Sequence, residues 1–193
     1  MIRTKQDFRE YLCKDALANG RSSVRAHFLS DLTWKYIVSL RTLELLSNYS
    51  GLKRLFVMPS WLFHKFRYHN LSVKCGYQIP LHAFDKGLSI AHLGTIVVND
   101  NAHIGQNCRI HEGVTIGANK GTSEAPTIGA NSFIASGAKI LGAIVIADDV
   151  AIGANAVVVK SITESGTTWA GVPARKISDN NSHKYFPSQM GLE

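Results

Sequence analysis

From residue 98 onward, a hydrophobic residue recurs at every sixth position of the chain. Ile or Val occupies all ten positions of this register, which breaks once after residue 116: Val98, Ile104, Ile110, Ile116, Ile128, Ile134, Ile140, Ile146, Ile152 and Val158. Strands of a β-sandwich would instead alternate with a period of two between turns spaced 8–12 residues apart. The six-residue period excludes a sandwich and indicates a stack of repeated structural units.

Residues that favour sharp turns follow each hydrophobic position by three. Eight of these ten residues are Asn, Gly or Asp: Asn101, Asn107, Gly113, Asn119, Asn131, Gly137, Ala143, Asp149, Asn155 and Ser161. Asn, Gly and Asp tolerate positive φ most readily, so we expect a corner after each short extended segment. Three segments would form one triangular coil of roughly 18 residues, with the β-branched side chains stacked inside.

Small residues occupy the other inward-leaning positions, as a narrow interior requires. They include Ala102, Cys108, Ser132, Ala138 and Ala156. We therefore interpret Cys108 as a core residue rather than a nucleophile. The chain has three cysteines, which fit neither a disulfide framework nor a zinc motif, so we expect free thiols at Cys13, Cys75 and Cys108.

The first 74 residues have a different pattern, which is typical of helices. Apolar residues recur at steps of three and four up to about residue 49, as at Leu40, Leu43 and Leu46, and predict two or three helices. A further helix start is predicted at Ser60, directly after Pro59. The sequence thus predicts a mostly β protein with an α-helical segment at residues 1–74, a β-helix domain at 75–177 and a tail at 178–193.

Charge is concentrated in the N-terminal part of the chain. The formal net charge is +7, but residues 1–75 contain 13 Lys and Arg against 5 Asp and Glu, whereas residues 76–193 contain 8 against 9. A basic segment with interleaved aromatic residues, GLKRLFVMPSWLFHKFRYHN, is open to three partners: nucleic acid, an anionic membrane surface or an acidic substrate. A solvated helical face with an aromatic core side is the simpler alternative.

No targeting signal or membrane-spanning stretch is evident. The N-terminus MIRTKQDFREYL is charged and helix-like rather than a signal peptide, and no run of about 18 uncharged apolar residues occurs. We therefore expect a cytoplasmic protein, with the basic region as a candidate for peripheral contact with the inner face of the membrane and no nucleic acid partner.

Three stretches resemble the hexapeptide acyltransferases: GLSIAHLGTIVVNDNAHIGQNCRIHEGVTIG, APTIGANSFIASGAKILGAIVIADDVAIGANAVVVKSI and WAGVPARKI. More narrowly, residues 75–177 resemble serine acetyltransferase and the O-acetyltransferases of bacterial capsule and lipopolysaccharide clusters. The resemblance implies a left-handed parallel β-helix, a homotrimer, and acetyl-CoA as the acetyl donor in the groove between subunits, with no metal. A right-handed coil would be the default from general rules, so the handedness rests on the resemblance alone.

The resemblance also implies a catalytic histidine. In serine acetyltransferases this residue falls in a His-x-x-Gly-Ile-Val-Val setting, and here His92 begins the comparable run HLGTIVV. Neutral imidazole suits a base that removes a proton from an attacking alcohol. However, His92 lies six residues before Val98 and would point into the core unless Gly94 breaks the register. His111 is expected on the adjacent coil, where it would orient the acceptor or the base.

Further residues are assigned to acetyl-CoA by similarity. Gly117, Ala118, Ser136 and Ala154 are expected to line the pantetheine groove, and Arg175 and Lys176 are expected to meet the CoA phosphates. The segment GANKGTSEAPT between Ile116 and Ile128 is interpreted as a loop that leaves the coil and helps to close this site, although twelve residues would also permit two plain repeats.

Departures from the serine acetyltransferase pattern affect the acceptor. The carboxylate that partners the catalytic histidine would fall near Tyr77, the Asp before that histidine is replaced by Ala91, and the Arg-His pair of the loop by Glu124 and Ala125. We therefore expect an acetyl-CoA-dependent O-acetyltransferase acting on a sugar hydroxyl of a bacterial surface polysaccharide or its precursor, with serine O-acetylation as the alternative. A backbone carbonyl or Asp85 is expected to orient His92.

Two rival functions belong to other classes. A γ-type carbonic anhydrase has the same kind of β-helix but needs three converging histidines around zinc, for which His82, His92, His103 and His111 are the candidates. Their spacing lacks the His-x-x-x-x-His that such a site resembles elsewhere. A non-catalytic β-helix scaffold is the other rival, and CoA binding discriminates against it.

Overall fold

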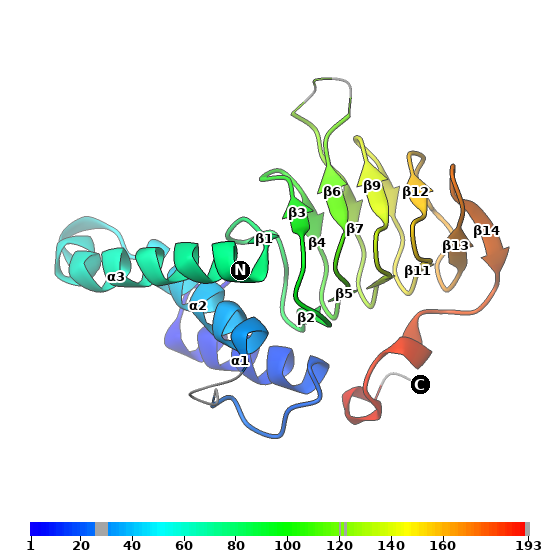
Figure 1. The fold of residues 1–193 in the computed structure, drawn as a ribbon. Helices are drawn as coiled ribbons and strands as arrows, with labels where there is room; N and C mark the ends of the chain where they lie inside the picture. The colour runs from blue at the N-terminus through cyan, green and yellow to red at the C-terminus, as the bar shows by residue number, and fades with distance from the viewer. Residues whose placement is uncertain (26–30, 120, 122, 192–193) are drawn as a thin grey trace.

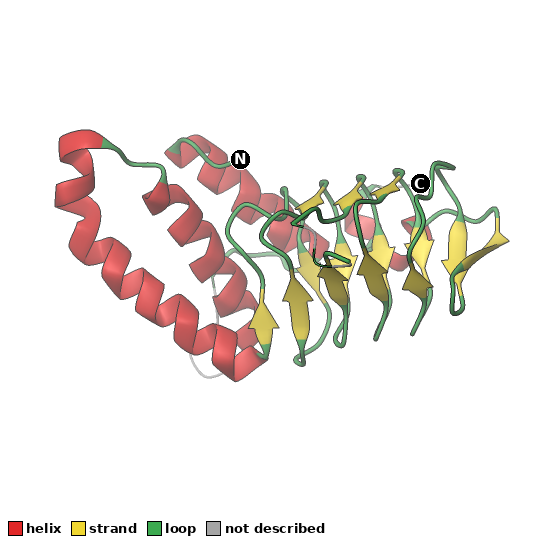
Figure 2. Cartoon of the chain, turned by 90° about the horizontal axis from the view of Figure 1, so that it is seen from above, coloured by secondary structure: helices red, strands yellow, loops and turns green. Residues whose placement is uncertain are grey.

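A computed structural model describes residues 1–25, 31–119, 121 and 123–191. Three helices come first: α1 (Lys5–Ala18), α2 (Leu32–Ser47) and α3 (Gly51–Cys75). The coils of a parallel β-helix follow from Tyr77 and stack away from the helices, and the C-terminal segment lies beside the stack (Figure 1). Seen from above, α3 extends outward beyond the first coil (Figure 2).

The β-helix has three faces, each a sheet of short strands. Face A contains β1 (Tyr77–Gln78), β3 (Ile96–Val98), β6 (Thr115–Gly117), β9 (Lys139–Leu141) and β12 (Val157–Val158). Face B contains β4 (His103–Ile104), β7 (Thr127–Ile128) and β10 (Val145–Ile146). Face C contains β2 (Ser89–Ile90), β5 (Arg109–Ile110), β8 (Phe133–Ile134), β11 (Ala151–Ile152), β13 (Thr168–Ala170) and β14 (Arg175–Ser178). Every pair is parallel except β13 with β14.

The interior of the coils confirms the predicted register. All ten Ile and Val positions are buried, and so are the small residues at Ala102, Cys108, Ser132, Ala138 and Ala156. Equivalent residues stack directly in neighbouring coils, for example Ile134 on Ile152 and Ile140 on Val158. Burial raises the pKa of Cys108 to about 12, so its thiol stays protonated, as expected of a core residue.

The corners follow the expected pattern at two of the three edges. Positive φ is found at the edges between faces B and C and between C and A, for example at Asn107, Gly113 and Asp149. Among the described residues, the edge between faces A and B does not use positive φ at Asn101, Ala143 or Ser161. The corner prediction was therefore wrong there, and at Ala143 the preceding Gly142 takes φ +103° instead.

The interruption after Ile116 is a loop, as predicted. Ile116 pairs with Ile140, whereas Val98 pairs with Ile116 and Ile140 with Val158, so the coil with the interruption is six residues longer than its neighbours. The chain leaves at the end of β6 and returns at β7, and the loop projects from the stack (Figure 1). Lys120 and Thr122 of this segment lie outside the described residues.

The helical region differs from the prediction in one respect. The third helix begins at Gly51, with Ser50 as its N-cap, and continues through Pro59 and Ser60 instead of starting at Ser60. Proline removes the hydrogen bond to the carbonyl four residues earlier, at Leu55. Because this part of the helix is exposed, water can satisfy that carbonyl, so the helix is not interrupted.

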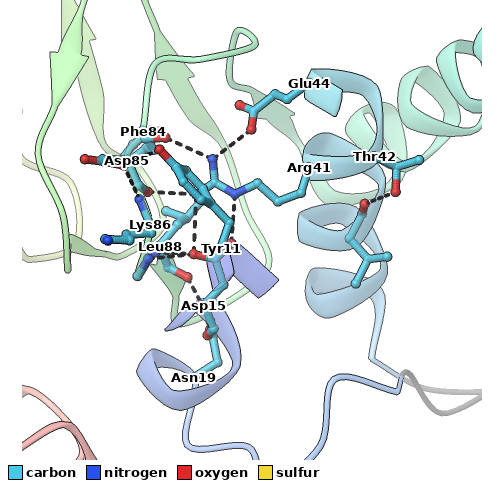
Figure 3. A network of polar contacts seen from close by, with 12 residues as sticks. Tyr11, Asp15, Asn19, Arg41, Thr42, Glu44, Phe84, Asp85, Lys86 and Leu88 are labelled. Carbon is cyan, nitrogen blue, oxygen red and sulfur yellow. Dashed lines mark hydrogen bonds and ion pairs between the residues drawn. The ribbon is translucent and has the colours of Figure 1, made fainter. Parts of the chain in front are cut away.

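A buried polar network joins the helices to the first coil. The Arg41 guanidinium donates to both carboxylate oxygens of Asp15, to Glu44 and to the backbone carbonyls of Phe84 and Asp85 (Figure 3). Asp15 also accepts from the backbone N–H groups of residues 87 and 88. The first coil is therefore held by the helices through charge-assisted hydrogen bonds as well as apolar packing.

Candidate active site

The edge between faces C and A brings together residues from successive coils. The last residues of four face C strands, Ile90, Ile110, Ile134 and Ile152, are aligned in parallel register. Residues two positions later therefore follow one another along this edge: His92, Glu112, Ser136 and Ala154. We call these four residues the corner ladder. Backbone hydrogen bonds continue the alignment past the strands, as from His111 N to Ile134 O at 3.0 Å.

His92 points away from the core. The first coil has two more residues than a regular one, because Ile90 pairs with Ile110 whereas Ile134 pairs with Ile152. Gly94, with φ +143°, lies in this irregular stretch, so the predicted break of register is confirmed. His92 is exposed, and its ring lies 5.5 Å from the His111 ring, centroid to centroid, at 81°.

Glu112 completes a cluster with the two histidines. A ring nitrogen of His92, a ring nitrogen of His111 and a carboxylate oxygen of Glu112 all lie within 4.8 Å of one another. Gly94 makes room for this arrangement, since a Cβ there would lie 2.8 Å from the Glu112 Cβ. Among the described residues, His111 Nε2 and Glu112 Oε2 are buried atoms without a hydrogen-bond partner. Both atoms are therefore candidates for a hydrogen bond to a substrate.

Electrostatics favour a neutral His111 and an ionised Glu112. Burial, followed by the charge of Arg109, lowers the pKa of His111. Hydrogen bonding from Ser136 is the main cause that lowers the pKa of Glu112, and the two histidines add to it. At neutral pH the site thus offers an imidazole that can accept a proton beside a carboxylate that stabilises the resulting cation.

Tyr77 of β1 holds the backbone of His92 and is itself in contact with α2. The Tyr77 hydroxyl donates to the His92 carbonyl at 2.9 Å and lies 3.2 Å from Thr33 Oγ1. Burial raises the pKa of Tyr77 to about 12, so it remains a donor. The expectation that Asp85 orients His92 was wrong, because Asp85 accepts from the Tyr11 hydroxyl in the network at the helices.

The C-terminal tail contributes an aromatic wall beside His111. The Phe133 ring lies 5.2 Å from the His111 ring and stacks on Tyr185 at 4.0 Å. Tyr185 belongs to the short helix η1 (His183–Tyr185), which is held on face C by a 2.7 Å contact between His183 Nε2 and Asp149 Oδ1. The tail therefore runs back along face C from β14 to β8, next to the candidate site.

The residues expected to bind CoA are divided between two edges. Ser136 and Ala154 lie in the corner ladder, and Ser136 Oγ is 3.5 Å from His111 Nδ1. Gly117 ends β6 and Ala118 follows it, so both lie at the opposite edge of face A. Within one chain, the structure does not bring them to the histidines, because the sequence repeat gives the coil position but not which edge carries the site.

Of the two basic residues expected to contact the CoA phosphates, Arg175 has no acidic neighbour in the structure described, whereas Lys176 has two. Arg175 is exposed on β14, and its Nη1 donates to the backbone carbonyl of Ala174. Lys176 instead contacts the carboxylates of Glu164 and Asp179. An anionic ligand would have to compete with both acids for Lys176.

A hollow borders the site on the side of the helices. It has a volume of about 470 Å³ and is lined by Asn19, Arg21, Asp31, Leu32, Thr33, Trp34, Ile90, Ala91 and Leu93. Arg21 lies 3.1 Å from Asp31 and stacks over the Trp34 ring at 5.0 Å. A cation, an anion and an aromatic ring therefore line the same hollow as Ala91 and Leu93, the two chain neighbours of His92.

The four candidate histidines, all of them in the described part of the chain, do not form the three-histidine site of a carbonic anhydrase. His82 and His103 line a separate hollow at face B, near Tyr11, whereas His92 and His111 lie at the edge between faces C and A. Sequence reasoning missed Glu112. Its position could have indicated it. Glu112 follows the inward Ile110 by two residues, just as His92 follows Ile90 one coil earlier.

Comparisons with known proteins agree with this architecture. The family model described as bacterial transferase hexapeptide (six repeats) matches residues 125–160. A serine acetyltransferase of Staphylococcus epidermidis is 33% identical over 170 residues, covering 77% of this chain and 78% of that protein. One from Helicobacter pylori is 41% identical over 95 residues, covering 48% of this chain and 55% of the relative. The chain thus spans about half the length of that relative.

Solved structures extend the likeness to the helical region. The crystal structure of serine acetyltransferase from Brucella abortus has a TM-score of 0.69 and 26% identity, covering 92% of this chain and 72% of that chain. A serine acetyltransferase in complex with CoA has a TM-score of 0.66 and 25% identity, and the match covers 90% of this chain and 71% of that chain. The fold is the left-handed parallel β-helix of hexapeptide repeats preceded by helices, and the chain belongs to the serine acetyltransferase family of acetyltransferases.

Proposed function

We propose that this chain is an acetyl-CoA-dependent O-acetyltransferase in which His92 is the general base. The observation that carries the proposal is the cluster of His92, His111 and Glu112 at one edge of a hexapeptide β-helix. Exposure makes His92 accessible to a substrate hydroxyl, and membership of the acetyltransferase family supplies the donor class. A non-catalytic scaffold would have no need of a carboxylate beside two histidines.

The reaction is a direct transfer. Neutral His92 takes the proton of the acceptor hydroxyl as its oxygen attacks the thioester carbonyl, and the imidazolium then returns that proton to the departing CoA thiolate. The products are an O-acetyl ester and free CoA. Glu112 stabilises the positive charge on the histidine during attack, and His111, which is held neutral, accepts a hydrogen bond from the acceptor or donates one to it.

The donor would lie along the corner ladder. Small residues lie at this edge beside Ser136 and in the coils after it, namely Ala135, Gly153, Ala154, Ala170 and Gly171. They let an extended chain approach the backbone over successive coils, which are spaced by roughly 4.8 Å. Arg175 lies past the end of this edge and is a candidate contact for a phosphate.

A trimer is part of the proposal. Gly117 and Ala118 lie at the far edge of face A, so they can line the donor groove only if a second subunit places that edge against the corner ladder. Light scattering of the purified protein should then give three chains per particle. A monomer with full activity would exclude this use of Gly117 and Ala118.

A matched pair of histidine variants tests the base. His92→Ala should lower acetyl transfer by about 10²–10⁴-fold, the usual contribution of general-base catalysis. His103→Ala removes an exposed histidine from face B and should leave the rate unchanged. Circular dichroism and light scattering would verify that both variants fold. An unchanged rate in His92→Ala would remove this residue from the mechanism.

For the acceptor, we propose L-serine first, because the relatives across 77–78% of both chains are named serine acetyltransferases. The hollow beside His92 offers Arg21 to a carboxylate and Asp31 to an ammonium group. These two charges already form an ion pair at 3.1 Å, so serine would have to separate them.

A sugar hydroxyl is the second candidate, and a specific observation favours it. Ala91 stands where serine acetyltransferases have Asp, and Glu124 and Ala125 stand where they have an Arg-His pair, so the groups expected to hold serine are absent at those positions. The aromatic wall of Phe133 and Tyr185 beside His111 suits the apolar side of a sugar ring. A release assay for free CoA, with L-serine, nucleotide sugars and oligosaccharides compared at equal concentration, separates the two acceptors.

A further inference from the structure

Helix α3 has two apolar sides, of which only one is covered by the protein. The covered side packs on α2: Leu71 and Cys75 are buried, Tyr68 stacks on Tyr36 at 5.3 Å, and Trp61 Nε1 donates to Ser47 Oγ. These residues recur at three- and four-residue steps, as a packed helix side requires. This packing holds α3 against α2 and leaves the opposite side of the helix uncovered by the described residues.

The opposite side carries large apolar residues that face solvent. Seven of them have 56–86% of their surface exposed: Leu52, Leu55, Phe56, Leu62, Phe63, Phe66 and Val73. Successive members are one to seven positions apart and follow heptad steps, so they form one stripe along the helix. We call this set the α3 stripe. The helix has 25 residues, which corresponds to a length of roughly 38 Å at 1.5 Å per residue.

All charges on this helix are positive. Between Gly51 and Cys75 there are five basic residues and no Asp or Glu: Lys53, Arg54, Lys65, Arg67 and Lys74. Three of them, Lys53, Arg67 and Lys74, are spaced by multiples of seven and so lie along one border of the α3 stripe. Lys65 lies over the Trp61 ring at 4.7 Å on the other border.

Two occupants could cover this side, a second copy of α3 or a lipid surface. Pairing two copies would place the basic borders against like charges, with no acid on either helix to compensate. Pro59 and Asn70 also interrupt the seam that a helix pair would need. An anionic lipid surface has the opposite charge and accepts aromatic side chains at the depth of the headgroups.

We propose that α3 docks the protein on an anionic lipid surface, with its axis in the plane of the membrane and the α3 stripe in the headgroup region. None of the described helices is long and apolar enough to cross a membrane, so the contact is peripheral. The basic border contacts lipid phosphates while Phe56, Phe63 and Phe66 insert. This inference depends on α3 alone and not on the proposed acetyl transfer.

Vesicle co-sedimentation tests the proposal with the full chain. Wild-type protein should bind vesicles of phosphatidylcholine and phosphatidylglycerol, and its binding should fall with added salt and be weak on phosphatidylcholine alone. The triple variant Lys53→Gln, Arg67→Gln, Lys74→Gln should bind about fivefold more weakly per charge removed. The control triple Arg9→Gln, Lys14→Gln, Lys160→Gln removes three exposed charges outside α3 and should change binding much less.

A second triple variant separates the two occupants. Phe56→Ser, Phe63→Ser, Phe66→Ser should lower binding to anionic vesicles at least tenfold, because aromatic insertion is lost, while light scattering without lipid gives the wild-type particle mass. No binding of the wild type at low salt would overturn the proposal, and so would equal losses in both charge triples. A smaller particle in the phenylalanine variant would assign the α3 stripe to contact between copies instead.

Discussion

Replacing Arg41 with Met should destabilise the attachment of the helices to the first coil. The Arg41 side chain is fully buried and donates five hydrogen bonds, with lengths of 2.7–3.3 Å, to Asp15, Glu44 and two backbone carbonyls. Although burial alone would lower the pKa of Arg41, Asp15 and Glu44 raise it, so the cation is present throughout the pH range of folding. Methionine fills a similar volume and leaves both carboxylates without their partner.

The size of the effect follows from the uncompensated charge. Removing one partner of a buried ion pair usually costs about 3–5 kcal/mol. For a chain of this length each kcal/mol lowers the melting temperature by about 2–4 °C, so the expected decrease is about 6–20 °C. Asp15 keeps its hydrogen bonds from the N–H groups of Gly87 and Leu88, which places the cost below that of an isolated buried carboxylate.

Thermal unfolding followed by circular dichroism, at fixed protein concentration, measures the effect. Arg41→Lys is the matched control, because it keeps the charge but loses the bidentate contact with Asp15, and it should cost less than Arg41→Met. Hydrogen exchange should show that α1 loses protection first. A melting temperature within 2 °C of the wild type in Arg41→Met, a shift of about 1 kcal/mol or less, would refute the reasoning.

Three further predictions concern the site and the core. Gly94→Ala should lower stability by about 1–3 kcal/mol and reduce activity, because φ is +143° and the new Cβ would contact Glu112; denaturation at equilibrium measures the first effect and a CoA-release assay the second. By NMR titration, His111 should have a pKa below its ordinary value, and Glu112→Gln should lower it further since the carboxylate raises it; a higher pKa in the variant would contradict the cluster geometry. With a thiol reagent, Cys13 should react rapidly in the folded protein and Cys108 only on unfolding, so rapid labelling of Cys108 would show that the coils open.

The sequence was most informative where one physical constraint repeats. The inward Ile and Val series predicted the coils between Val98 and Val158, since a stiff β-branched residue recurs wherever a segment faces the interior. The positive-φ residues predicted two edges of the three. At Ala143 the prediction was wrong because Gly142, one residue earlier, makes the turn.

Features that depend on contacts between distant segments could not be predicted. Glu112 joins His92 only because the first coil is two residues longer than a regular coil, an irregularity that the period conceals. Tyr185 reaches Phe133 from the tail, where no repeat operates. The start of α3 was misplaced because Pro59 was taken as a helix boundary, although an exposed helix can continue through it.

The returning tail changes how the stack can come apart. In a solenoid each repeat contacts only its neighbours, so terminal units can fray one at a time. Here His183 contacts Asp149, Tyr185 covers Phe133, and the short helix η2 (Ser188–Met190) contacts α1 at the opposite end. The tail therefore links the last coil to the middle coils and to α1. If the last coil unfolds, the middle coils also lose their contacts with the tail, so we expect the β-helix to unfold more cooperatively than a solenoid without such a tail.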